Sequence, residues 1–380
     1  MKVCHVFPFF SIKAFGGTCD LMYKIVKAQV NVGLKPTILT GNYKFDSDLA
    51  ANLRGCEIVL INSYLDKYGF SIMPSLNKTL RSMPKFDVVH FHVFRTYQNI
   101  VVYNYCREYN IPLILDAHGA VPYAQNKVFL KKRYDNFWGR KILSYAKWVV
   151  AETQVGIKEY LEIDRKIDKK KMTILSPPFD TDEFKELPIK GEFRKKNNIK
   201  SSTFLITFLG RIHYLKGNDF LIKGFNKFVK DYNTDSSLVF IGNDDGHMSD
   251  LRNLVDKYNL NNYVRFVGFL GGKDKNSALI DSNVVAQLSR QEQGAWAPFE
   301  AILCGTPIVV TQHTGSGEDV RRIDAGKTIE FDDIEALANY FHDLYNNYDE
   351  YKLQAMKAKK YIEDNLSFNQ RVNEYTELYQ

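Results

Sequence analysis

The 380-residue sequence lacks the features that mark several protein classes. No uninterrupted apolar run approaches the ~18 residues that a membrane-spanning helix needs. The first residues do not resemble a signal peptide, because His5, Pro8 and Lys13 interrupt their apolar stretch. The five cysteines form no C-x-x-C pair, which argues against a disulfide framework and a zinc site. These absences predict a cytoplasmic protein with free thiols.

Low-complexity tracts are also missing, and the composition is that of a folded protein. Apolar residues make up 45% of the chain and charged residues 25%, which excludes disorder, collagen and coiled coil. At about 150 residues per domain, the length indicates two domains.

The net charge of +7 is concentrated in one segment, residues 121–150. Seven basic residues and seven aromatic residues are interleaved there with a single acid, Asp135. A basic, aromatic helix suits an anionic membrane surface, so peripheral contact with the inner membrane face is one interpretation. The other is a helix packed through its aromatic residues with solvated lysines. No nucleic-acid-binding motif accompanies the segment, so we expect no nucleic-acid partner.

Short β-branched runs alternate with amphipathic stretches in the first half of the chain. This alternation is typical of parallel α/β units. A loop with Gly16 and Gly17 follows the first run, and a helix is predicted from Thr18, its N-cap. The predicted strands are residues 3–7, 36–40, 87–91, 112–115 and 148–151.

The alternation starts again after a proline-containing linker, residues 176–191. Asn218 is predicted to cap the first helix of this second half. The predicted strands are residues 203–209, 238–241, 264–267, 284–288 and 307–311. We therefore expect an α/β protein with two Rossmann-like, doubly wound domains, residues 1–180 and 181–362, facing each other across a cleft. Residues 363–380 are expected to form a helix that packs back on the N-terminal domain.

The window 292–300 carries the most specific chemical signal. Glu292 follows a predicted strand, and Glu300 is predicted in the first turn of a helix that Pro298 starts and Gly305 ends. Ionised carboxylates only accept hydrogen bonds, so they suit the hydroxyl groups of a sugar or ribose. The amides of Gly294 and Ala295, at the start of that helix, suit a phosphate.

Two cations lie five residues apart after the first strand of the second half, Arg211 and Lys216. Arg211 offers a planar fork and Lys216 a point charge, and together they can neutralise a diphosphate. Negative charge that develops on a leaving diphosphate would be stabilised by both.

These motifs, taken in order, resemble the retaining GT-B glycosyltransferases of family 4, the group 1 glycosyl transferases. The central element is E-x7-E followed by EA-x-x-CGTP, from Glu292 to Pro307. The supporting elements are residues 15–17 (FGG), 87–92 (DVVHFH), 115–119 (LDAHG), 208–217 (FLGRIHYLKG) and 264–268 (VRFVG). The resemblance covers almost the whole chain.

The resemblance implies a role for each matching residue. Glu300 would bind the ribose of a UDP- or GDP-linked sugar, and Glu292 the sugar hydroxyls. His118 would contact the donor sugar near the reacting carbon. Gly16, Gly17 and Gly268 would approach the donor with their backbones, while Arg211 and Lys216 would hold its diphosphate. The N-terminal domain would bind the acceptor and the C-terminal domain the donor, and no cofactor or metal would be required.

Two positions depart from the family pattern. Gln293 stands where a glycine is usual, which affects the sugar-facing loop, and residues 176–180 read SPPFD in place of PNGVD. His90, His92 and His118 suggest a metal trio, but the sequence shows no carboxylate partner for them, so no metal site is predicted.

The sequence thus predicts a cytoplasmic retaining hexosyltransferase that uses a nucleotide sugar and a hydroxyl acceptor. The basic segment favours a lipid-linked acceptor or surface glycan, as in polysaccharide biosynthesis. A sugar-nucleotide epimerase of GT-B-like fold and a non-catalytic nucleotide-sugar binding protein are the alternatives. A dehydrogenase is least favoured, since no G-x-G-x-x-G follows either opening strand.

Overall fold

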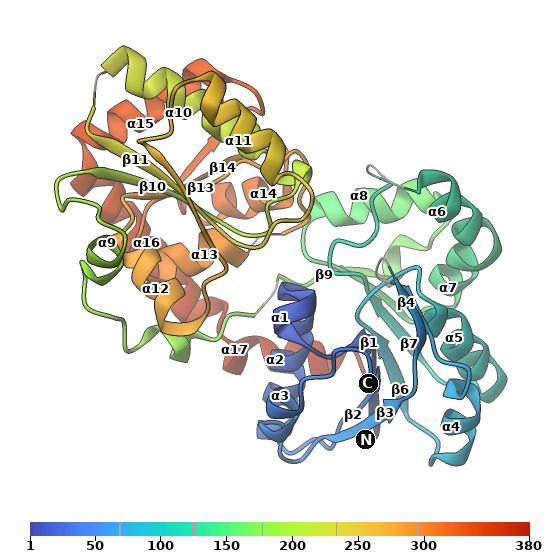
Figure 1. The fold of residues 1–380 in the computed structure, drawn as a ribbon. Coiled ribbons are helices and arrows are strands. Elements are labelled where there is room, and N and C mark those ends of the chain that lie inside the picture. The colour runs from blue at the N-terminus through green and yellow to red at the C-terminus, as the bar shows by residue number, and fades with distance from the viewer. Residues whose placement is uncertain (68–69, 124–126, 177, 233, 295) are drawn as a thin grey trace. The chain divides into compact units, whose positions relative to one another are not determined.

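The computed structural model describes residues 1–67, 70–123, 127–176, 178–232, 234–294 and 296–380. It divides into two compact units (Figure 1). The first unit comprises Met1–Phe179 and Leu366–Gln380, and the second comprises Asp180–Asn365. Both units are parallel α/β structures.

The first unit contains a long series of alternating strands and helices. In chain order these are β1 (Val3–Phe9), α1 (Ile12–Phe15), α2 (Gly17–Asn31), β2 (Thr37–Gly41), α3 (Ser47–Ala51), β3 (Glu57–Ile61), β4 (Tyr64–Lys67), β5 (Phe70–Ile72), α4 (Leu76–Ser82), β6 (Val88–Phe91), α5 (Tyr97–Tyr109), β7 (Leu113–Asp116), α6 (Val128–Tyr134), the π-helical turn η1 (Asp135–Gly139), α7 (Arg140–Tyr145), β8 (Trp148–Ala151), α8 (Gln154–Ile163), the 3-10 turn η2 (Lys169–Lys171), β9 (Met172–Ile174) and, at the C-terminus, α17 (Phe368–Glu377).

The strands described for this unit form a seven-stranded parallel sheet in the order β3-β2-β1-β6-β7-β8-β9, with β4 and β5 pairing separately. The order reverses direction between β1 and β6, where the connections leave toward opposite faces of the sheet. Ligands bind at such a switch point, outside the carboxyl ends of the strands.

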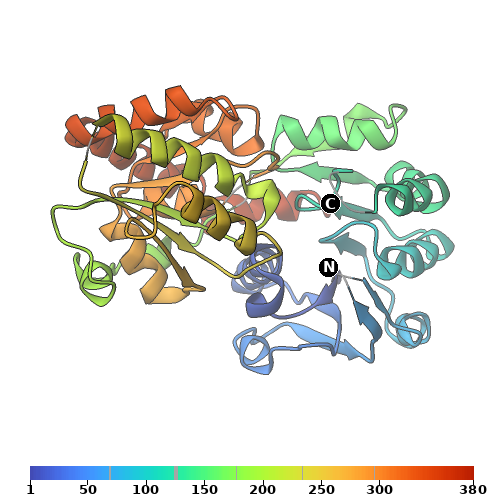
Figure 2. The same ribbon diagram turned by 45° about the horizontal axis from the view of Figure 1, so that its top comes forward.

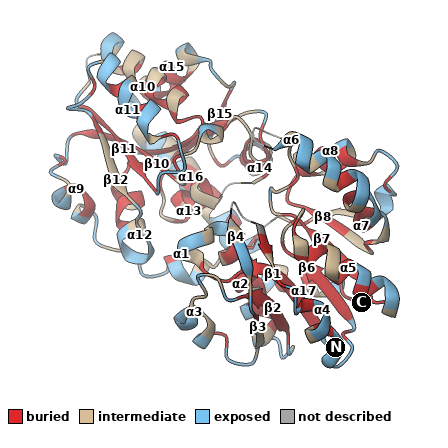
Figure 3. Ribbon diagram, turned by 45° about the vertical axis from the view of Figure 1, so that its right-hand side comes forward, coloured by how far each residue is buried: buried red, intermediate tan, exposed pale blue. Residues whose placement is uncertain are grey.

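Alternate residues of the central strands supply two different cores. Cys4 and Val6 of β1 pack with α4, α5, α7 and α8, whereas Phe7 packs with α2. Because side chains alternate along a strand, His5 lies on the same face as Phe7, the face that α2 covers. Figure 3 colours the central strands as buried. Figure 2 shows the same sheet from a second direction.

The second unit repeats the alternation with a different set of helices. Its elements are the 3-10 turn η3 (Thr181–Phe184), α9 (Glu192–Lys196), β10 (Phe204–Leu209), the 3-10 turn η4 (Tyr214–Lys216), α10 (Asn218–Tyr232), β11 (Ser236–Ile241), α11 (Met248–Lys257), β12 (Val264–Gly268), α12 (Gly272–Asp281), β13 (Val284–Gln287), α13 (Trp296–Leu303), β14 (Ile308–Thr311), α14 (Gly315–Arg322), β15 (Lys327–Ile329), α15 (Ile334–Asn346) and α16 (Tyr348–Asn365).

The described strands of the second unit form one sheet in the order β12-β11-β10-β13-β14-β15. Counted within the unit this is the 3-2-1-4-5-6 order of a Rossmann fold. One core lies under α10, α11 and α15, and it includes Phe208, Phe225 and Phe240. The fold class predicted from the sequence, α/β with two Rossmann-like sheets, is confirmed.

Several local predictions were wrong or incomplete. Thr18 is not an N-cap, since Gly16 holds that position and α2 starts at Gly17. The sequence analysis also did not predict β3, β9 and β15, which lie at the edges of their sheets. Edge strands bury only part of their surface, so their hydrophobic pattern is weaker.

Candidate functional site

The candidate site of the second unit lies where the loops after β10 and β13 meet. These strands are neighbours in the sheet, and β10 marks the reversal of strand order. The loop after β10 carries Arg211 and Lys216, and the loop after β13 carries Glu292 and Gly294. Parallel strands end at one edge of the sheet, so the fold itself collects these side chains.

Gly217 lets the two loops approach each other. Its φ is +63°, and a Cβ atom there would lie 1.9 Å from the carbonyl oxygen of Leu288. The backbone after Lys216 therefore lies directly against the end of β13, a position that only glycine can occupy.

Lys216 and Glu292 form an ion pair at this junction. The Lys216 ammonium donates a hydrogen bond to Oε2 of Glu292, and the side chains are 18% and 15% exposed. Ser289 Oγ donates to the same oxygen at 3.2 Å, and the backbone carbonyl of Glu292 accepts from Gly315 at 2.8 Å. The carboxylate is thus held in place through contacts of both its side chain and its backbone.

Arg211 faces solvent to a much greater extent. Its side chain is 67% exposed and pairs with Asp245, which is itself exposed. An exposed pair of this kind contributes at most about 1 kcal/mol, so an incoming anion displaces Asp245 at little cost.

Arg290 ties the two loops together and was missed by sequence analysis. Its guanidinium donates to both oxygens of Asp219 at 2.7 Å and lies over the ring of Tyr214 at 3.9 Å. A bidentate pair combined with ring stacking orients a planar cation strongly. A charged residue directly after a predicted strand was the available signal.

Glu300 lies two residues further into its helix than predicted. α13 begins at Trp296, so Pro298 is its third residue and Glu300 its fifth. Proline is tolerated throughout the first turn, where its missing N–H has no intrahelical partner. The carboxylate of Glu300 pairs with Lys275 of α12 at 2.6 Å, and this cation was not anticipated either.

The small residues predicted to bind the donor, four glycines and one alanine, fall into three groups. Gly16 (φ +68°, ψ −148°) and Gly268 (φ +78°) have backbone conformations that side chains disfavour, and neither has a neighbour that would block a Cβ atom. Gly17 is the first residue of α2 and Gly294 lies two residues before α13. Ala295 lies outside the described residues.

His118 belongs to the first unit and follows β7. Its φ of +44° is uncommon for a residue with a side chain. Nδ1 lies 3.1 Å from Asp116 Oδ1 and 3.4 Å from Glu152 Oε1, and Nε2 lies 3.1 Å from Nδ1 of His92. Both ring nitrogens are therefore engaged within this unit. The carboxylates also correct the sequence analysis, which found no acidic partner for this histidine.

His118 and Asp116 are both buried, and each changes the pKa of the other. Burial disfavours the charged ring, but Asp116 and Glu152 outweigh it and raise the pKa of His118. Burial raises the pKa of Asp116 to about 7, against the lowering effect of His118. The carboxylates thus favour the charged form of the ring, and the ring in turn favours the ionised form of Asp116.

Comparison with protein families decides the classification. The family model described as Glycosyl transferases group 1 matches residues 189–379, half of the chain. The chain belongs to the group 1 glycosyl transferases. A second model, Glycosyltransferase Family 4, matches residues 15–183 of the first unit.

Two curated relatives of this glycosyl transferase are similarly distant. An uncharacterized glycosyltransferase of Methanocaldococcus jannaschii is 23% identical over 65% of this chain and 62% of its own length, less than two thirds. The putative glycosyltransferase YtcC of Bacillus subtilis is 23% identical over 78% of this chain and 72% of its own.

Among solved structures, the fold is shared with Anabaena HepE in complex with UDP and glucose. The TM-score is 0.81 at 17% identity, and the match covers 99% of each chain. At this identity the likeness shows the fold, which is GT-B.

The apolar side chains in the basic segment of this glycosyl transferase are of two kinds, packed and exposed. Tyr134, Trp138 and Tyr145 pack against the core of the first unit, as a purely structural helix requires. Phe129, Leu130 and Phe137 are instead exposed on α6 and η1. The packed residues fit a helix with a structural role, and the exposed residues fit contact with a membrane surface. Among the described residues, no helix is both long and apolar enough to cross a membrane.

Proposed function

We propose that this protein transfers a sugar from a UDP- or GDP-linked donor to a hydroxyl acceptor with retention at the anomeric carbon. The observation that carries the proposal is the Lys216–Glu292 pair at the Rossmann switch point, with Arg211 on the same loop. Cation and carboxylate there match the two ends of a diphosphate sugar.

Donor binding exchanges partners within existing pairs. Lys216 leaves Glu292 for the diphosphate, and Glu292 accepts hydrogen bonds from sugar hydroxyls in its place. Arg211 exchanges Asp245 for a phosphate oxygen. Glu300 accepts from the ribose, while the backbone near Gly294 and Ala295 and near Gly16, Gly17 and Gly268 approaches the donor. Both carboxylates lose a cation in these exchanges: sugar hydroxyls take its place at the mostly buried Glu292, and water does so at the exposed Asp245.

In the reaction, the bond between the anomeric carbon and the diphosphate oxygen breaks, and the acceptor oxygen bonds to the same face of that carbon. The acceptor proton passes to the departing phosphate. Arg211 and Lys216 stabilise the charge that develops on this group. His118 lies near the reacting carbon, by resemblance to the family. No step calls on a metal or cofactor.

The donor is tested first by thermal shift with UDP, GDP, ADP and their sugar conjugates on wild type and Glu300→Ala. A ligand that binds only the folded state raises the melting temperature. UDP is the first candidate, because the HepE structure contains it. We expect one base to raise the melting temperature, and Glu300→Ala to reduce that shift. No shift with any of them would contradict the proposal.

Transfer is tested by product analysis with Lys216→Met. We expect kcat to fall by about 100-fold or more, because one charge on the leaving group is lost. Lys196→Met is the matched control, since Lys196 is an exposed lysine of the same unit, paired with Asp274. Donor epimerisation without an acceptor would identify an epimerase, and binding without turnover would identify a binding protein.

We also propose that the acceptor is lipid-linked and that α6 contacts an anionic membrane at the inner face, in surface-glycan assembly. The support is the exposed pair Phe129 and Leu130 beside the basic run that ends at Arg133.

Sedimentation with anionic vesicles tests this contact. At about 1 kcal/mol per basic residue, we expect Lys132→Ala with Arg133→Ala to weaken binding about tenfold or more. Lys131 is left intact because its ammonium donates to the carbonyl of Pro122 at 2.8 Å. Lys169→Ala with Lys170→Ala, in η2, is the matched control. Equal binding by all three proteins would exclude α6 as the contact.

A further inference from the structure

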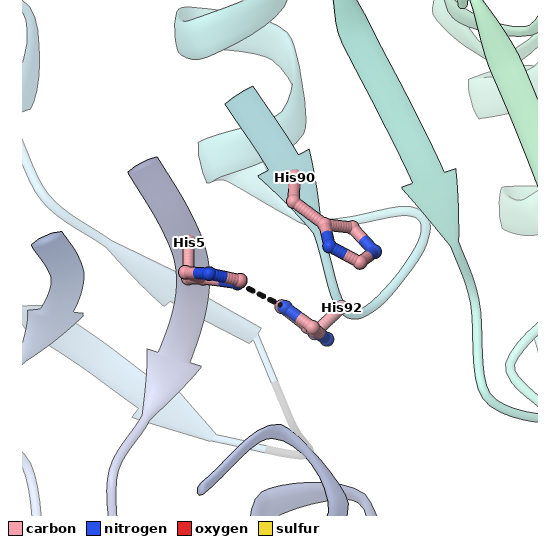
Figure 4. Close-up of side chains that lie close together, drawn as sticks. All are labelled: His5, His90 and His92. Atoms are coloured by element: carbon pink, nitrogen blue, oxygen red, sulfur yellow. Dashed lines mark hydrogen bonds between the residues drawn. The ribbon is translucent and has the colours of Figure 1, made fainter. Parts of the chain in front are cut away.

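Three fully buried histidines lie together in the first unit, two of them part of a motif that the proposed function leaves unused. His5 on β1 stands directly opposite His90 on β6 in the parallel register. His92 follows two residues after His90 and so points to the same face of the sheet. Figure 4 shows the three rings converging from the two strands. One nitrogen atom of each ring lies within 4.8 Å of one nitrogen of the other two.

The spacing favours hydrogen bonding over a shared metal ion. His5 Nδ1 lies 2.7 Å from His92 Nε2, a hydrogen-bond distance. Two nitrogen ligands of one tetrahedral zinc, each about 2.0–2.1 Å from the metal, would lie about 3.3 Å apart. The other nitrogen of His5 is also engaged, because Nε2 lies 2.8 Å from Gln29 Oε1.

The hydrogen bonds continue in both directions from this pair. At one end, His92 Nδ1 reaches His118 Nε2 at 3.1 Å. At the other, Gln29 Nε2 donates to the hydroxyl of Tyr379 at 2.7 Å, and that oxygen lies 3.0 Å from His90 Nδ1. An unbroken row of hydrogen bonds therefore joins the residue after β7 to the C-terminal segment after α17.

We propose that His92, His5 and Gln29 form a relay that determines which nitrogens of His118 carry protons. They are positioning residues, since each acts through His118. The relay is a property of the folded first unit. Its effect on sugar transfer rests on the proposed function of His118.

The relay has two arrangements because a neutral imidazole has one donor and one acceptor nitrogen. With the Gln29 oxygen toward His5, every bond is donated from His118 toward Gln29, so Nε2 of His118 carries a proton. Nδ1 carries a second proton toward Asp116, and the ring is positively charged. With the amide reversed, His92 donates to His118 Nε2 and the ring is neutral.

The surroundings of His118 favour the charged arrangement. The groups that face the ring are Asp116, Glu152 and His92. Tyr160 of α8 and Tyr375 of α17 lie near the two carboxylates, and Arg371 lies near Tyr375. A positive ring beside the reacting carbon would stabilise the departing diphosphate.

The test replaces Gln29 with two side chains of similar length in the full chain. An ionised carboxylate can only accept hydrogen bonds, so Gln29→Glu holds the relay in the charged arrangement. Gln29→Met offers no acceptor, so His5 turns its proton to His92 and the neutral arrangement is favoured. NMR of ¹⁵N-histidine-labelled protein then reports each ring nitrogen as the pH is varied.

We expect Gln29→Glu to raise the titration midpoint of His118 and Gln29→Met to lower it, each by about one pH unit, the equivalent of one charge-assisted hydrogen bond. The pH profile of kcat/KM for transfer shifts with it. Tyr379→Phe leaves His5 and Gln29 in place. We therefore expect it to change the titration midpoint of His118 by less than either Gln29 variant does.

Wild-type protein supplies a measurement that does not depend on the folding of any variant. The relay requires His5 and His92 to occupy the same tautomer, both protonated on Nε2 or both on Nδ1. Opposite tautomers would overturn it, as would one zinc ion per chain in elemental analysis of the purified protein.

The relay and the proposed function fail separately. If the two Gln29 variants shift the titration midpoint of His118 in opposite directions but the protein transfers no sugar, the relay is supported and the proposed function is contradicted. Unchanged titration in both Gln29 variants of an active transferase would overturn the relay alone.

Discussion

At the scale of single residues, the candidate site of the second unit holds its charged side chains in ion pairs. Lys216 with Glu292 and Lys275 with Glu300 are each mostly buried and in contact. Removing one member leaves a buried charge unpaired, which costs more than the pair contributes. Lys216 can turn to a phosphate only when Glu292 gains hydroxyl donors, so we expect phosphate and sugar to be recognised together.

The first prediction concerns Gly217. Gly217→Ala places a Cβ atom 1.9 Å from the Leu288 carbonyl in a left-handed conformation. We expect the free energy of unfolding to fall by about 2 kcal/mol or more. Gly246→Ala is the control, since its φ is +87° and its Cβ atom would meet no neighbour. Urea denaturation measures both, and equal losses would show that the approach to Leu288 does not matter.

At the scale of elements, strand pairing decides which side chains meet. The register that sets His5 opposite His90 also brings His92 to His5. A shift of β6 by one residue would turn His90 and His92 to the opposite face of the sheet, where Cys4 and Val6 of β1 lie. The histidines are therefore buried as neutral groups, and burial lowers the pKa of His5 to about 4.

A pH dependence of stability follows from this burial. Burial lowers the pKa of His90 far below the 6.5 of the unfolded chain, so below pH 6.5 the unfolded state binds more protons. His90 therefore costs stability as the pH falls. We expect His90→Phe to reduce the slope of the free energy of unfolding against pH by about 1.4 kcal/mol per pH unit between pH 6.5 and 5. Urea denaturation at several pH values measures it, and an unchanged slope would show that His90 is protonated in the folded protein.

At the scale of the whole molecule, the chain returns to the first unit at its C-terminus. α16 ends the second unit at Asn365, and α17 packs against α2 of the first. Tyr375 and Tyr379 are buried there. The last fifteen residues thus complete a domain whose other elements end before residue 180.

Truncation after Asn365 tests this return. Because Tyr379 would no longer bond Gln29, we expect amide exchange to rise in α2 and β1 while the strands β10 to β14 keep their protection. The nucleotide binding that we propose for the second unit should persist. Exchange that rises equally in both units would indicate that α17 supports the whole chain.

The sequence predicted most of this fold, because buried parallel strands and amphipathic helices leave strong patterns. It located Arg211, Lys216, Glu292 and Glu300 through their order and spacing. It missed Lys275 and Arg290, whose partners lie on other elements. It placed Glu300 two residues too near the start of its helix, since Pro298 marks the first turn of a helix without marking its first residue.

By itself the sequence determined the two α/β units and the residue types of the candidate site, because periodicity and motif spacing are local properties. Only the tertiary structure decided which charges pair and which histidines meet. In the sequence, His5 was notable only as a polar residue that interrupts an apolar run. Its role depends on the sheet order that sets β1 beside β6 and on α17, which brings Tyr379 from the far end of the chain. Contacts of that range leave no trace in any short window of sequence.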